Sequence, residues 1–177
     1  MRRLAAVWGI VGVLGILGWA VYRISPHAIA AFENHSFGAL EWAFFGIWMI
    51  FMLFAEGYRG FHQAFAPRVV SRAQTLVTQP HPVACILAPF FCFGFFRATR
   101  KRMIVSWSVA SGIVLLILSV RLLNQPWRGI VDSGVVAGLS VGMLSILYYA
   151  ARWLFGHPVN YPADLPAGEK AENGTRS

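Results

Sequence analysis

The segment VACILAPFFCFGFF (residues 83–96), followed at once by RATRKR (residues 97–102), decides how the rest of the chain is arranged. A helix needs about 20 apolar residues to cross a hydrocarbon core of roughly 30 Å, so this apolar segment is short for a membrane span. Pro89 stands near its middle. Whether the segment crosses determines on which side of a membrane each charged group lies.

The composition predicts an all-α integral membrane protein. Hydrophobic residues make up 57% and charged residues 12% of the 177 residues, and the mean hydropathy is +0.58. Soluble domains carry about 25% charged residues. Four apolar runs are each about long enough to cross, and they fall at 4–22, 37–55, 103–120 and 130–151. We therefore expect a single polytopic membrane domain over residues 1–156. A proline-rich tail at 157–177 is expected to be disordered in the cytoplasm.

The distribution of Lys and Arg distinguishes two topologies. If 83–96 crossed as a fifth span, with a cytoplasmic N-terminus, seven of the 15 cations would lie inside and eight outside. If the segment is re-entrant or a half-span, four helices cross and only three cations lie outside, namely Arg23, Arg121 and Arg128. The positive-inside rule therefore favours four spans with both termini cytoplasmic. A short, tilted or kinked fifth span is the alternative.

The first apolar run and the net charge each allow a second interpretation. A signal peptide would begin with Arg2 and Arg3, but 4–22 exceeds the usual apolar length of roughly 7–15 residues, so an uncleaved helix is favoured. The net charge of +8 does not indicate nucleic-acid binding, because the cations flank apolar runs.

The expected location is a plasma membrane, taken as a bacterial inner membrane, and the expected partners are the bilayer and anionic phospholipids.

Gly134, Gly138 and Gly142 form a ridge with four-residue spacing in the last span. Glycines at this spacing remove side chains from one helix face, so another helix backbone can approach closely. We expect this ridge to pack within the molecule. Homo-oligomerisation or contact with another membrane protein through the ridge is the alternative.

Two acids lie near the outer ends of predicted spans, Glu41 about one turn into the second and Asp132 at the start of the fourth. A carboxylate so close to hydrocarbon should be paired or should face a cavity. Arg128 precedes Asp132 by four residues, a spacing at which side chains on a helix meet. A structural ion pair is expected, and a proton or cation site is the alternative.

Basic residues gather on the predicted cytoplasmic side. Pro67 is expected to begin a helix that lies on the inner membrane surface, with an apolar face that includes Val69, Val70 and Ala73. Cations there suit anionic headgroups or a phosphorylated ligand. The candidate lipid- or phosphate-binding residues are Arg59, Arg68, Arg72, Arg97, Arg100, Lys101 and Arg102. The nearby acid–base groups are Glu56, His62 and His81.

The sequence names no reaction. It holds no P-loop, G-x-S-x-G or H-E-x-x-H motif, and the five histidines lie outside the long apolar runs. We expect no cofactor and no metal site. The leading hypothesis is a non-enzymatic membrane protein that packs with itself or a partner and engages anionic lipid. The alternatives are a small proton- or cation-coupled transporter that uses Glu41 and Asp132, and a lipid-modifying enzyme that uses the cytoplasmic arginines.

Overall fold

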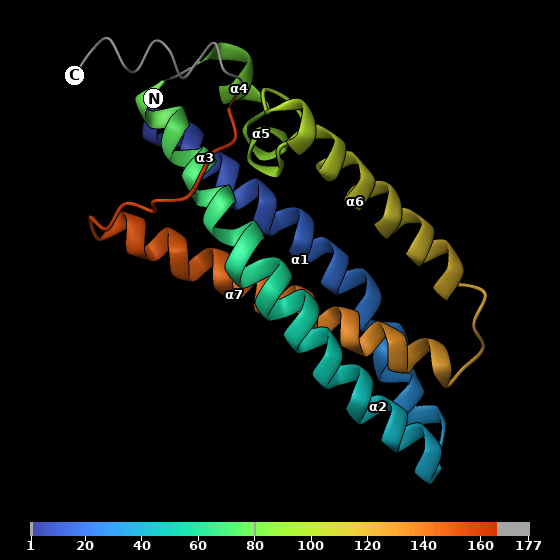
Figure 1. The fold of residues 1–177 in the computed structure, drawn as a ribbon. Helices are drawn as coiled ribbons and strands as arrows, with labels where there is room; N and C mark the ends of the chain where they lie inside the picture. Colours follow the sequence, from blue (N-terminus) through green and yellow to red (C-terminus); the bar gives the residue numbers. More distant parts are fainter. Residues whose placement is uncertain (1, 80, 166–177) are drawn as a thin grey trace.

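The computed structural model describes residues 2–79 and 81–165, and all regular structure in these ranges is helical. Figure 1 shows long helices lying side by side, with a compact turn of short helices near one end. In chain order the elements are α1 (Arg2–Asn34), α2 (Ala39–Met52), the π-helix η1 (Leu53–Phe65), α3 (Ala66–Thr78), α4 (Pro82–Ile86), α5 (Ala88–Phe93), α6 (Arg100–Val120) and α7 (Trp127–Leu154).

Four helices are long and apolar enough to cross a membrane, as expected from composition: Arg3–Asn34, Ala39–Thr78, Arg100–Val120 and Trp127–Leu154. We call the end that holds the start of α1 the amino-terminal end. The end of α3, the start of α6 and the end of α7 lie toward it (Figure 1). The opposite end, with the α1–α2 turn and the α6–α7 loop, is called the distal end.

The second long helix corrects the predicted interfacial helix. The stretch from Ala39 to Thr78 is one continuous helix of 40 residues, so no separate helix begins at Pro67. The backbone N–H of Ala66 donates to the carbonyl of Phe61, a five-residue step, and α3 then follows the four-residue α-helical step. Pro67 falls where the step changes, so its missing N–H does not interrupt the helix.

The apolar face of α3 is packed inside the bundle. Val69, Val70 and Ala73 are fully buried, and α3 contacts α1, α5 and α7. On α1 the matching buried residues recur every three or four positions, as on one face of a helix: Ala6, Ile10, Val13 and Leu17. The apolar face predicted for this segment is therefore present, but it meets helices instead of lipid.

The short apolar segment 83–96 does not form a fifth long helix. It holds α4 and α5, which break at Leu87, and Pro89 lies in the first turn of α5, where no backbone donor is needed. Gly94 ends α5 in the left-handed region, with φ of 84°. Helices α4 and α5 pack against α1. Gly12 of α1 lies directly against the Pro89 ring, so there is no room for a side chain at position 12.

Helix α6 stands apart from the other long helices (Figure 1). It has few contacts with α7, and every residue from Ser111 to Ser119 is exposed. Near its start, the hydroxyl of Ser106 donates to the carbonyl of Phe93 at 3.2 Å. The packed core therefore consists of α1, the long second helix, α7 and α5, with α6 tethered at its two ends.

Candidate functional site

Arg72 is the most deeply buried ionisable side chain at the amino-terminal end. It is 0% exposed. Its Nε donates to the carbonyl of Phe91 (2.6 Å) and its Nη1 to that of Ala163 (2.6 Å), while Nη2 donates to those of Phe96 and Arg97 (3.0 and 3.1 Å). The guanidinium also lies 4.2 Å from the Phe91 ring centroid. Arg72 therefore joins α3 to the turn after α5 and to the carboxy-terminal segment.

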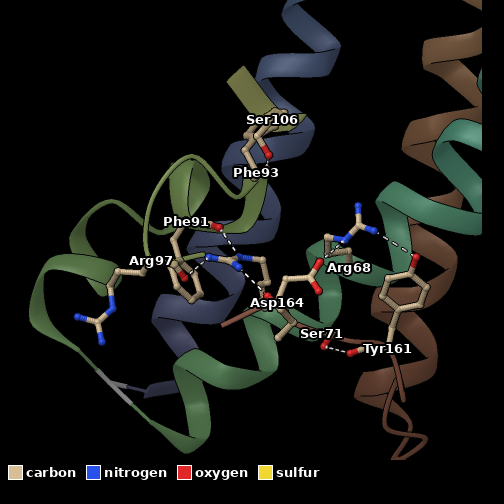
Figure 2. A network of polar contacts seen from close by, with 10 residues as sticks. Arg68, Ser71, Phe91, Phe93, Arg97, Ser106, Tyr161 and Asp164 are labelled. Atoms are coloured by element: carbon tan, nitrogen blue, oxygen red, sulfur yellow. Dashed lines mark hydrogen bonds and ion pairs between the residues drawn. The ribbon is translucent and has the colours of Figure 1, made fainter. Parts of the chain in front are cut away.

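The segment 157–165 is bound to the bundle, so the prediction of a disordered tail is wrong for these residues. The hydroxyl of Ser71 donates to the carbonyl of Tyr161 at 2.6 Å, and the backbone N–H of Thr99 donates to that of Asp164 at 2.8 Å. Arg68 donates to the Tyr161 hydroxyl and pairs with the Asp164 carboxylate at 3.3 Å. Figure 2 shows Arg68, Tyr161 and Asp164 gathered between the helices. Residues 166–177 lie outside the described part of the chain.

The predicted basic cluster is divided by these contacts. Arg72 is enclosed and cannot meet a headgroup, and Arg68 is half-buried beside Asp164. The exposed members are Arg59 on η1 and the pair Arg100 and Lys101 at the start of α6. Arg97, with φ of 48°, points away from Arg68 and Asp164 in Figure 2, and Arg102 is half-buried near Gly94.

A groove of about 320 Å³ opens beside this network, between the start of α3, the end of α7 and the bound tail. This volume lies in the range of small-ligand sites. Arg152, which is exposed, supplies its charge, and Tyr149, Tyr161 and Asn160 supply hydrogen-bonding groups. Neither Arg152 nor the tail belongs to the predicted cluster. The groove could not be predicted from the sequence, because one of its walls is the tail, and nothing in the sequence indicates that the tail packs against the helices.

The glycine ridge of α7 faces the second long helix within the molecule. The Trp48 ring lies directly against Gly134, and a side-chain carbon added at Gly142 would lie 2.5 Å from the Phe61 ring. At Gly138 the nearest atom is Oε2 of Glu56, 3.3 Å from such a carbon. The ridge is therefore occupied by α2 and η1, and any self-association has to use another surface.

Glu41 and Asp132 both make local contacts at the distal end. The Glu41 carboxylate accepts a hydrogen bond from the backbone N–H of Gly38, the residue that precedes the first turn of α2. Asp132 is 8% exposed, and its Oδ2 lies 3.7 Å from Nε of Arg128. Each acid therefore has a partner that stabilises its own helix end.

Glu56 and His62, expected on the cytoplasmic side after the second apolar run, lie along the interface between η1 and α7. Both are half-buried. The Ser145 hydroxyl donates to the carbonyl of Val141 at 2.8 Å, which leaves its oxygen to accept from Nδ1 of His62 at 3.2 Å. The sequence could not reveal this placement, because Pro67 suggested that the second helix had already ended.

The described residues hold no group of three or more His, Cys, Asp or Glu side chains that could bind a metal ion. Comparison of the chain with protein-family models, with curated proteins and with solved structures found no match.

Proposed function

We propose that the chain is a multi-pass membrane protein, with its amino-terminal end in the cytoplasm, that binds an anionic phospholipid headgroup in the groove beside α7. The observation that carries the proposal is the groove of about 320 Å³ that joins Arg152 to the tyrosines of α7 and the tail. Guanidinium and phenol groups together suit a phosphate with a polar headgroup.

The membrane orientation is supported by charge. Of the 15 Lys and Arg residues, Arg23, Arg121 and Arg128 belong to the distal end and Arg59 lies near the middle of the second long helix, whereas the other 11 belong to the amino-terminal end or to the sequence after α7. Cations favour the cytoplasmic side, where anionic lipids also attract them by about 1 kcal/mol for each basic residue near the surface. The membrane we propose is a plasma membrane, such as a bacterial inner membrane.

Native mass spectrometry of the full chain, released from mild detergent with added lipid, tests this proposal. We expect phosphatidylglycerol to bind in preference to phosphatidylcholine. Arg152→Gln should weaken that preference about fivefold, which corresponds to about 1 kcal/mol. Arg23→Gln is the matched control, because Arg23 is an exposed arginine on the distal half of α1.

The exposed cations of α6 distinguish the groove from general surface attraction. Arg100→Gln combined with Lys101→Gln removes two exposed charges at the same end without touching the groove lining. We expect this double change to leave the stoichiometric lipid bound. Equal binding of the two lipids, or a loss caused by the α6 double change and not by Arg152→Gln, would contradict the groove as the site.

A further inference from the structure

Glu56 lies near the middle of the longest helix in the described chain. It is the eighteenth residue of the 40-residue helix from Ala39 to Thr78. Its Oε2 lies beside Gly138, and Gly138 stands inside the apolar run 130–151, eight residues from the start of that run and 13 from its end. At about 1.5 Å per residue these ends are about 12 and 20 Å away, so if α7 crosses a membrane, the carboxyl group of Glu56 lies within the apolar layer.

The environment of Glu56 contains no partner for a negative charge. The side chain is half-buried, and its Oε2 lies against Gly138, whose lack of a side chain makes room for it. Within the described residues, no hydrogen bond or ion pair involves Glu56. An ionised carboxylate is costly in such a setting, and protonation removes the charge.

The other ionisable groups nearby are engaged elsewhere or face outward. On η1 itself, Arg59 is exposed, and Tyr58 and His62 stack on each other with ring centroids 5.7 Å apart. The ionisable residues on the elements that pack against η1 are Glu41 on α2, Arg68 and Arg72 on α3, and Arg128, Asp132, Tyr148, Tyr149 and Arg152 on α7. None of them forms a hydrogen bond or an ion pair with Glu56.

Other polar groups occupy the same interface between η1 and α7. Along α7, Gly138 is followed by Ser145, which bonds to His62, and then by Tyr149, whose ring centroid is 5.4 Å from that of His62. Tyr149 also lines the groove. The π-helical stretch brings Glu56 and His62 onto the same interface, and irregular helices of this kind occur often at functional sites.

We propose that Glu56 is a proton-binding site within the membrane, reached from the amino-terminal end along His62, Ser145 and Tyr149. The ligand is a proton, and the site uses one carboxyl group, unlike the alternative of a proton site formed by Glu41 and Asp132 at the distal end. This assignment does not depend on lipid binding in the groove.

Dicyclohexylcarbodiimide, an apolar reagent that adds to protonated carboxyl groups, tests the site in the full chain reconstituted in lipid vesicles. At about pH 7, well above the ordinary range for carboxyl groups, we expect Glu56 to be modified at least about tenfold more than the exposed acid Glu33. Peptide mass spectrometry locates the adduct, so the wild-type chain suffices. Glu56→Gln should remove that adduct.

Two controls distinguish a protonated Glu56 from an ionised Glu56 that is paired with Arg59 or with a sodium ion. Arg59→Gln, which removes the nearest cation along η1, should leave the modification of Glu56 unchanged, whereas a severalfold increase would show that Glu56 is an ionised partner of Arg59. Sodium chloride should protect no better than choline chloride. Failure of Glu56 to react in folded chains, while it reacts after unfolding, would overturn the proposal, as would specific protection by sodium.

Discussion

Replacing Arg72 by methionine should destabilise the protein strongly. Arg72 makes four hydrogen bonds to backbone carbonyls, and bonds from a charged donor contribute about 1.5 kcal/mol each at the low end of their range, or about 6 kcal/mol together. The variant no longer has to bury a guanidinium group, which costs several kcal/mol. The expected net loss in the free energy of unfolding is about 3 kcal/mol.

Thermal unfolding in mild detergent measures this loss. For a chain of this length, about 3 kcal/mol corresponds to a fall in Tm of about 6–12 °C. Arg72→Lys should fall in between, because an ammonium group cannot reach four carbonyls in a planar fork. Ser71→Ala removes one hydrogen bond, to the Tyr161 carbonyl, and should cost about 1 kcal/mol. Arg59→Met, an exposed change on the same helix, is the control and should be nearly neutral.

The loss of stability in Arg72→Met should begin at the contacts that Arg72 makes with the tail. Because Arg72 holds Ala163 and the turn after α5, its removal should expose the segment 157–165 to proteases before the helices unfold. Limited proteolysis of the native protein, read by mass spectrometry, detects this early cleavage. If Arg72→Met is as stable as Arg59→Met and its tail is cleaved no faster, the guanidinium does not hold these segments together.

Three further predictions concern packing, burial and charge. Gly142→Leu should lower the folded yield, because the ridge touches the second helix there, whereas Gly112→Leu on α6, where nothing lies within 4 Å, should be tolerated; size-exclusion profiles compare the two. Cys92 is 1% exposed, so a variant with this cysteine alone should resist maleimide at about pH 8 until it is unfolded. A double-mutant cycle on thermal stability with Asp132→Asn and Arg128→Gln should give a coupling of about 0.5 kcal/mol, and strict additivity would show that the two charges do not interact.

Much of the architecture follows from local sequence properties. The apolar runs are long enough to specify four helices, and the cations after Phe96 favour a segment 83–96 that does not cross. Both inferences depend only on length, hydropathy and the position of charge. The boundaries were harder to predict, because the end of a helix depends on what its next turns can pack against. The helix continues past Pro67 since α3 finds a partner in α1.

The site depends on contacts between distant parts of the chain. Arg72 looks like a surface cation in the sequence, and only the carbonyls of the α5 turn and of the tail make its burial favourable. The same tail forms one wall of the groove. The sequence predicts that Glu56 follows the second span, which is expected to end at residue 55. Its position opposite Gly138 depends on how η1 and α7 pack along each other, which the sequence does not show.

The membrane topology can be measured directly by labelling single cysteines in intact cells with a membrane-impermeant maleimide. In a background without Cys85 and Cys92, the informative positions are Thr99, exposed at the amino-terminal end, and Ser36, exposed in the distal α1–α2 turn. Four spans with the amino-terminal end in the cytoplasm predict that Ser36→Cys is labelled and Thr99→Cys is protected until the cells are opened. Ready labelling of Thr99→Cys in intact cells would contradict that arrangement.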